Sequence, residues 1–262
     1  MHLLCRGSGY PILFIHGIPT NHQLWSGIIE QMCGNFTCFA VDLPGLGKTP
    51  SEPYRPDYLV SLAARIDNLR IANDIDKWHV VGHDAGSAVA AQYAHSFRQH
   101  VGCLALLSPA LFPDLKPYFP LELLRKPVIG ECLAPLIHPL FWNLAMRRAV
   151  RNEEGLARSG SIDFRAPFTG MFGAWQFMRI LRWGKPSTVL AHFSNILPRL
   201  SMPTLIFHGS RDPAIPVSFA RRARNLIPNS ELLHVDAGHF IPLNRPAFVA
   251  NRLQSFFAEP RP

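Results

Sequence analysis

The amino-acid sequence predicts an α/β fold in which helices cover both faces of a mostly parallel sheet. Short apolar runs rich in β-branched and aromatic residues alternate with longer stretches of helical spacing, a pattern typical of parallel sheets. Glycine-containing loops follow several of the apolar runs, as expected where strands end. The 262 residues, 48% of them hydrophobic, suffice for one α/β unit with an insertion.

The elements of residues 1–110 are expected in a regular order. Strands are predicted at Tyr10–Ile15, Phe36–Val41, 80–81 and 103–107, and helices at 24–32, 58–71 and directly after residue 84. The glycine-rich loop at 42–49 lacks the GxxxxGKS/T spacing of a phosphate-binding loop. We therefore expect this part to form the first half of the sheet without a nucleotide site.

The composition changes between residues 112 and 198. Prolines and aromatic residues are frequent, helix-like stretches occur at Leu121–Arg125, 141–151 and 172–183, and no clear strand is evident. Afterwards we expect strands at 203–209 and 231–235 and helices at 218–226 and 246–257. Residues 1–110 and 200–262 are thus predicted to form the core, with residues 111–199 inserted as a helical cap, called the cap segment below.

Positive charge is concentrated in this middle region. Residues 111–200 contain twelve Lys or Arg and six Asp or Glu, and so carry +6 of the formal net charge of +8. A nucleic-acid-binding face would more often interleave basic residues with exposed aromatics, so we expect no nucleic-acid partner. A solvated basic surface is the default interpretation, and steering of an anionic substrate toward a cleft is the alternative.

The cysteines and the hydropathy favour a cytoplasmic protein. No CxxC spacing is present, so neither a zinc site nor a disulfide framework is expected from the five cysteines Cys5, Cys33, Cys38, Cys103 and Cys132. No run reaches the roughly 18 apolar residues that span a bilayer, and the amino-terminal stretch is too short for a signal peptide. We expect no stable membrane insertion, and the oligomeric state stays open.

A sharp turn is predicted around Asp84. Val80 and Val81 lead into Gly82-His83-Asp84-Ala85-Gly86, and an alanine-rich helical pattern begins at once. Glycine at both flanking positions allows strand and helix to approach closely, and the central residue is held at the carboxyl end of the strand in a strained conformation. The simpler interpretation is that Asp84 only caps the following helix.

A carboxylate at this point favours nucleophilic chemistry. It is ionised at neutral pH and attacks a saturated carbon that carries a halide or a strained epoxide oxygen; water and a base must then hydrolyse the enzyme ester. Asp212 and His239 follow the strands predicted at 203–209 and 231–235. Each alone would be taken for a turn or surface residue, but the order nucleophile, acid, histidine predicts a triad. His239 would activate water and Asp212 would fix its tautomer.

Two backbone N–H groups are candidates for an oxyanion hole. Ala85 directly follows the proposed nucleophile, and Ile18 lies in the loop His16-Gly17-Ile18-Pro19 after an earlier strand. These donors would stabilise the charge that develops on the Asp84 carbonyl during ester hydrolysis. No metal or organic cofactor is implied, because nucleophile, base and water suffice.

With these residues, the sequence resembles the α/β-hydrolase superfamily over nearly its whole length, and within it the aspartate-nucleophile branch of epoxide hydrolases and haloalkane dehalogenases. The resemblance rests on His16-Gly17-Ile18-Pro19, Gly82-His83-Asp84-Ala85-Gly86, Asp212 and Gly238-His239. It implies the α/β-hydrolase fold with an inserted cap, and a small apolar organic substrate.

Differences within this branch favour an epoxide substrate. Haloalkane dehalogenases usually carry Asn and Trp, as halide donors, at the positions of Ile18 and Ala85. Fluoroacetate-type dehalogenases carry arginines just after the nucleophile, where this chain has Ala85, Gly86, Ser87 and Ala88. We therefore expect an epoxide hydrolase. A haloalkane or haloacid dehalogenase is the alternative, and a non-catalytic, small-molecule-binding homologue is the second.

An epoxide hydrolase of this type also needs an acid in the cap, normally a pair of tyrosines. The cap segment contains one tyrosine, Tyr118, with His138 and His192 as possible substitutes. Trp175 is a candidate for lining an apolar pocket, although its spacing equally suggests core packing.

Overall fold

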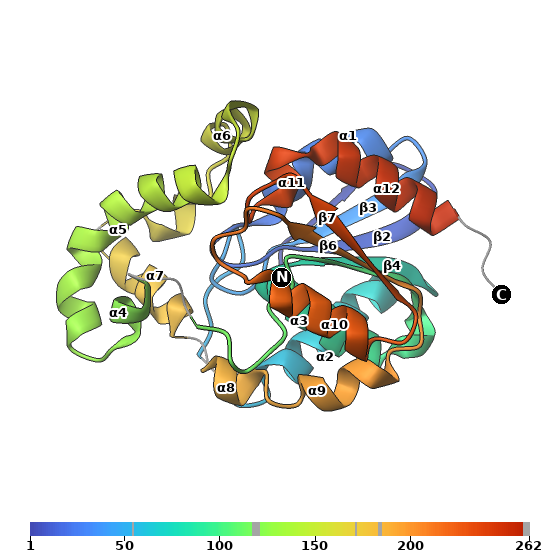
Figure 1. Ribbon diagram of the computed structural model, residues 1–262, viewed down its shortest axis with the longest axis horizontal. Coiled ribbons are helices and arrows are strands. Elements are labelled where there is room, and N and C mark those ends of the chain that lie inside the picture. The colour runs from blue at the N-terminus through green and yellow to red at the C-terminus, as the bar shows by residue number, and fades with distance from the viewer. Residues whose placement is uncertain (54, 117–120, 171, 183–184, 259–262) are drawn as a thin grey trace.

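The computed structural model contains a seven-stranded sheet with helices on both faces (Figure 1). It describes residues 1–53, 55–116, 121–170, 172–182 and 185–258, and leaves the side chains of 121, 136–143 and 145 undescribed. The strand order is β1-β3-β2-β4-β5-β6-β7. β1 is antiparallel to β3, and all other neighbouring strands are parallel. The predicted α/β fold class is confirmed.

The strand positions follow from burial. Their bounds are β1 Leu3–Arg6, β2 Tyr10–Ile15, β3 Phe36–Val41, β4 Trp78–His83, β5 Val101–Leu107, β6 Thr204–Gly209 and β7 Ser230–Val235. Every residue of β4 and β6 is buried, because strands covered on both faces require side chains that pack on each side. The short edge strand β1 was not predicted, and its burial pattern is only partial.

Two layers of helices cover the sheet (Figure 1). One layer contains α1 Ser26–Met32, α11 Ile241–Asn244 and α12 Pro246–Ala258, and the other contains α2 Tyr58–Ala72, α3 Ala85–Ser96 and α10 Val217–Leu226. Short 3-10 helices lie at His22–Trp25, Arg98–His100, Ala166–Phe168 and Leu197–Arg199. No helix in the described ranges combines the length and the apolarity that crossing a membrane requires.

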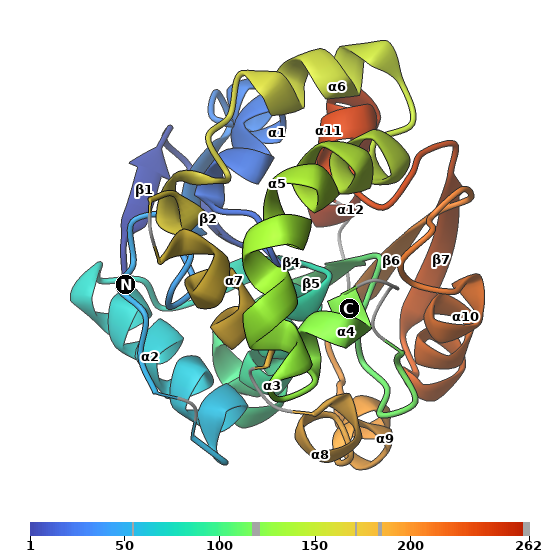
Figure 2. The ribbon, with the colours of Figure 1, turned by 90° about the vertical axis from the view of Figure 1, so that its left-hand side faces the viewer.

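Helices, and no strand, occupy the described residues between β5 and β6. They are α4 Leu121–Arg125, α5 Ile129–Ala149, α6 Glu153–Gly160, α7 Gly173–Leu181, α8 Pro186–Val189 and α9 Phe193–Ile196. Helices α4, α5 and α7 form a lobe beside the sheet, and this lobe faces the viewer in Figure 2. Helix α5 starts well before the predicted position 141, because its backbone stays helical through Pro135 and Pro139, residues that argue against a helix interior.

Candidate active site

Asp84 occupies the junction of β4 and α3. Its backbone angles are φ 50° and ψ −123°, a region that non-glycine residues rarely adopt. A Cβ atom on Gly82 would lie 2.6 Å from the Gly86 carbonyl oxygen, and one on Gly86 would lie 2.4 Å from the His16 carbonyl oxygen. The Asp84 side chain makes no N-cap hydrogen bond to α3. The turn thus presents the carboxylate and does not use it as a helix cap.

The two oxygens of Asp84 have different surroundings. Oδ2 accepts a hydrogen bond from the Ile18 backbone N–H at 3.1 Å, and Oδ1 lies 3.9 Å from His239 Nε2. Burial raises the pKa of Asp84, while His239 and the backbone N–H groups of Ala85 and Ile18 act in the opposite direction. Both N–H groups proposed for the oxyanion hole therefore interact with the carboxylate.

Asp212 and His239 form a close pair beside Asp84. His239 Nδ1 donates to Asp212 Oδ2 at 2.9 Å, and Asp212 Oδ1 accepts from the backbone N–H groups of Ala214 and Ile215 at 2.8 and 3.0 Å. This arrangement places the Nδ1 proton toward Asp212 and leaves Nε2 on the side of Asp84. Burial would lower the pKa of His239, but the charges of Asp212 and Asp84 outweigh it and raise the pKa to about 9.

His83 connects the turn that carries Asp84 to the loop that carries His239, called the histidine loop below. Its buried Nε2–H donates to the backbone carbonyl of His239 at 3.0 Å, and the two ring centroids are 4.9 Å apart. Burial, with the nearby His239, lowers the pKa of His83 to about 3, so its ring is neutral at pH 7. The sequence identified His83 only as part of a motif, whereas its side chain positions the loop that carries the proposed base.

The loop that carries Ile18 is fixed by His16. His16 Nδ1 donates to the Gly17 carbonyl at 2.9 Å, and its Nε2 accepts from the Leu43 N–H at 3.0 Å. Gly17 must remain glycine, because a Cβ atom there would lie 2.5 Å from Asp84 Oδ2. Pro19 follows Ile18 across a cis peptide bond and lines the cavity described next.

A mostly apolar cavity of ≈ 300 Å³ opens beside Asp84 and His239. Among the lining residues that the structure describes, Tyr58 provides the only hydroxyl group. The same lining contains three cationic side chains from the cap segment, Lys116, Arg125 and Arg148. The apolar part comes mainly from Leu43, Leu46, Leu59, Leu62, Val89, Phe177, Ile180, Val189 and Leu190.

Two of the four cap candidates, His192 and Trp175, have described side chains. Tyr118 lies outside the described residues, as does the side chain of His138 in α5. His192 Nε2 is hydrogen-bonded to Gln92 Oε1 of α3 at 2.8 Å, and Trp175 contacts Phe172, with ring centroids 6.1 Å apart. Neither His192 nor Trp175 belongs to the cavity lining. Tyr58, at the first turn of α2, lines the cavity and was not considered from the sequence; its place just after a strand-end loop was the available signal.

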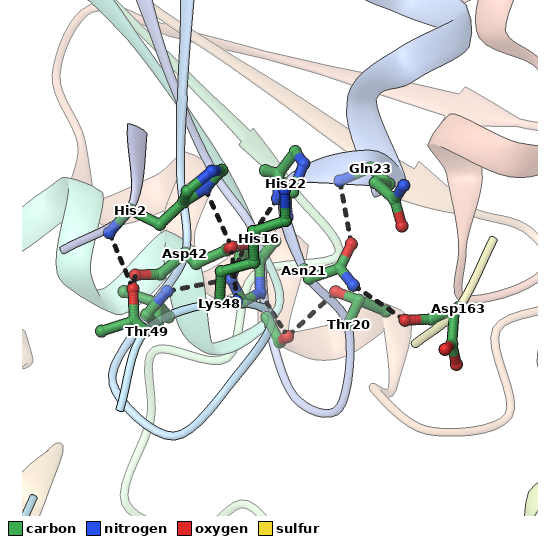
Figure 3. A network of polar contacts seen from close by, with 12 residues as sticks. His2, His16, Thr20, Asn21, His22, Gln23, Asp42, Lys48, Thr49 and Asp163 are labelled. Carbon is green, nitrogen blue, oxygen red and sulfur yellow. Dashed lines mark hydrogen bonds and ion pairs between the residues drawn. The ribbon is translucent and has the colours of Figure 1, made fainter. Parts of the chain in front are cut away.

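A second polar cluster contains none of the residues proposed for the reaction. His2, His22 and Asp42 offer ligand atoms that all lie within 4.8 Å of one another, and are thus the residues described here that could hold a metal ion. Figure 3 shows them together with His16 and Lys48.

Comparison with known proteins places the chain in a family. Residues 10–130 match the family model of the alpha/beta hydrolase fold. An uncharacterised protein of Mycobacterium tuberculosis (strain ATCC 25618 / H37Rv) is 30% identical over 98% of this chain and 77% of its own length. The chain belongs to the α/β-hydrolase superfamily. A poly(3-hydroxyalkanoate) depolymerase of Ectopseudomonas oleovorans is 28% identical over 96% of this α/β-hydrolase and 85% of its own length.

Two further proteins are similar to this α/β-hydrolase over different extents. A soluble epoxide hydrolase of Corynebacterium sp. (strain C12) is 35% identical over 107 residues, which are 41% of this chain and 37% of that protein. The structure of the haloalkane dehalogenase DbeA from Bradyrhizobium elkani USDA94 covers 98% of this chain and 93% of its own, with a TM-score of 0.79 and 21% identity. This structural likeness shows the shared fold alone.

Proposed function

We propose that this α/β-hydrolase forms a covalent ester on Asp84, with an epoxide as its substrate class. The supporting observation is the placement of Asp84: its backbone is strained, one carboxylate oxygen faces the Ile18 N–H, and the other faces His239 across 3.9 Å. A carboxylate whose role was only structural would be expected to pair directly with a buried donor on both oxygens.

In the first step, Asp84 Oδ1 attacks an epoxide carbon. A C–O bond forms as the ring C–O bond breaks, and the released oxygen takes the proton of the Tyr58 hydroxyl. Tyr58 is suited to this role because a phenol remains protonated at neutral pH, and burial raises the pKa of Tyr58 further. The products of the step are an alkyl ester on Asp84 and a Tyr58 phenolate.

In the second step, His239 Nε2 takes a proton from water, and the hydroxide attacks the Asp84 carboxyl carbon. Oδ2 becomes the oxyanion and faces the Ile18 N–H, while the Ala85 N–H also interacts with this carboxyl group. Collapse expels the alcohol oxygen, which takes the proton back from His239. The new carboxyl group loses its proton, which returns through solvent to Tyr58. The net reaction adds water to the epoxide and gives a vicinal diol.

A carbon–halogen compound is the second candidate. A halide leaves without being protonated, but hydrogen-bond donors stabilise it as it departs. Ile18 and Ala85 instead contribute apolar side chains to the cavity. The preference for an epoxide therefore rests on Tyr58 and on these two side chains.

Intact-protein mass measurement of a His239→Gln variant tests the proposal. With a panel of epoxides and haloalkanes, we expect an adduct on Asp84 that persists in the variant and is hydrolysed by the wild type, because the variant lacks the water-activating base. Asp84→Asn should give no adduct. Tyr58→Phe should slow adduct formation from epoxides and leave haloalkane adducts unchanged. An inactive wild type without an adduct from any compound would instead support a binding protein.

A further inference from the structure

The cluster of His2, His22 and Asp42 joins three segments of the chain (Figure 3). His2 directly precedes β1, His22 begins the 3-10 helix that follows β2, and Asp42 directly follows β3. His22 Nδ1 is 2.8 Å from Asp42 Oδ1, and His2 Nδ1 is 3.1 Å from Asp42 Oδ2. Two imidazole nitrogens and a carboxylate thus converge from positions that no sequence motif would associate.

The backbone holds each of these residues in place. The His2 N–H donates to Thr49 Oγ1 at 2.9 Å, and the His2 carbonyl accepts from the Asp42 N–H at 3.0 Å. The His22 N–H donates to Asp42 Oδ1 at 2.7 Å, and the Lys48 N–H donates to Asp42 Oδ2 at 2.9 Å. The side chains therefore converge without a large cost in ordering them.

Burial at the cluster is graded. The Asp42 side chain is fully buried, that of His22 is 11% exposed and that of His2 is 28% exposed. An ion could therefore enter past His2. The buried Nδ1 of His2 lies 3.1 Å from Asp42 Oδ2 without meeting the geometry of a hydrogen bond.

The ligand types suit a metal ion. The three residues offer two imidazole nitrogens and a carboxylate, which are ligands that Zn²⁺ binds in proteins.

We propose that His2 Nδ1, His22 Nδ1 and the Asp42 carboxylate bind one Zn²⁺ ion, with water as the fourth ligand. Nitrogen and carboxylate ligands lie about 2.0–2.2 Å from zinc, which gives ligand atoms about 3.3 Å apart in a tetrahedron. The pairs at 2.8 and 3.1 Å are close to this value, and the widest separation within the group is 4.8 Å, so small side-chain rotations suffice. His22 would keep its ring proton on Nε2 and bind through Nδ1.

The expected consequence is a more rigid Ile18 loop. His22 begins the 3-10 helix that directly follows the loop with Ile18, and an ion would tie this segment to both β1 and β3. Mg²⁺ and Ca²⁺ prefer all-oxygen sites and should not replace Zn²⁺ here.

Isothermal titration of untagged protein with Zn²⁺, repeated by equilibrium dialysis, tests the site. We expect one Zn²⁺ per chain and a rise in Tm on binding. His2→Gln and His22→Gln should each weaken binding by at least ~10-fold, since even outer-sphere partners of a metal ligand are worth that much. The matched control is His100→Gln, because His100 lies outside the cluster and bonds to the Asp76 carbonyl.

Three results would overturn the proposal. They are wild-type protein that binds no Zn²⁺, a His22→Gln variant with wild-type affinity, and equal losses in His22→Gln and His100→Gln. The second result would identify chelation by the amino-terminal residues alone. Circular dichroism of each variant without metal shows whether it folds. The site does not depend on Asp84, so its failure leaves the proposed reaction untouched.

Discussion

Asp84 and His239 affect each other's charge, and the proposed ester changes that relationship. In the free enzyme, the carboxylates of Asp212 and Asp84 both help to raise the pKa of His239, to about 9. Once Asp84 is esterified its charge is gone, while Asp212 remains at 2.9 Å from Nδ1. The pKa of His239 should therefore be lower in the intermediate, so that it becomes a base when a base is needed.

This reasoning predicts that both steps slow on acidification, each because of a different group. Ester hydrolysis needs neutral His239, so its rate should rise with pH and reach half of its maximum below about pH 9. Ester formation needs ionised Asp84, whose pKa is raised by burial, so its rate should fall on acidification. Rapid-quench mass spectrometry of the alkyl enzyme measures both. A hydrolysis rate that rises with the same pH dependence in His239→Gln would contradict the assignment.

At the scale of elements, hydrogen bonds join the cap segment to core residues near the site. Asn152, which caps α6, exchanges side-chain bonds with Asn244 of α11: Asn244 Nδ2 to Asn152 Oδ1 at 2.7 Å, and Asn152 Nδ2 to the Asn244 carbonyl at 3.1 Å. Asn244 Oδ1 also accepts from the Gly238 N–H at 3.0 Å, beside His239. On the other side, Asn21 donates to the Asp163 carbonyl at 3.2 Å.

Asn244→Ala should therefore disturb both stability and the histidine loop. Removing the buried amide leaves the Gly238 N–H without its acceptor and takes one donor from Asn152 Oδ1, at about 1–3 kcal/mol for a buried group. We expect a loss of that size in the free energy of unfolding, measured by urea denaturation, and a slower hydrolysis of the ester with ester formation less affected. Asn73→Ala is the control, since its exposed side chain bonds only to the Leu69 carbonyl. Equal effects of the two variants would argue against this role of Asn244.

Some features of the structure could be predicted from the sequence and others could not. Buried strands such as Tyr10–Ile15 and Phe36–Val41 were predicted with their observed bounds, because a parallel strand in a covered sheet leaves a continuous apolar run. The start of α5 was not predicted, because tertiary packing overrides the local effect of Pro135. The order of Asp84, Asp212 and His239 suggested that they would meet. Contacts such as those of His83 with His239 and of His2 with Asp42 leave no periodic pattern in the sequence. They can be recognised only in the folded structure.

For the whole molecule, the regional charge and the cavity coincide. Residues 111–200, which are the cap segment and Leu200, carry +6 of the formal net charge of +8. Three cationic side chains of the cap segment, Lys116, Arg125 and Arg148, line the apolar cavity. Arg125 is half-buried, and burial lowers its pKa. Among the described lining residues, Asp84 is the only carboxylate. The field inside the cavity therefore favours a substrate with an apolar body and an anionic group.

A pair of epoxides that differ only in a carboxylate or its methyl ester tests this preference. The anionic member should have the higher kcat/KM at low salt and lose that advantage as ionic strength rises, because about 0.1 M salt screens charges beyond roughly 10 Å. Arg148→Gln should lower kcat/KM for the anion several-fold and leave the ester unchanged. Arg147→Gln, an equally exposed neighbour outside the described lining, is the control. If both arginine variants reduce the anion's rate equally, the effect comes from the overall charge of the region; if neither does, the basic residues form only a solvated surface.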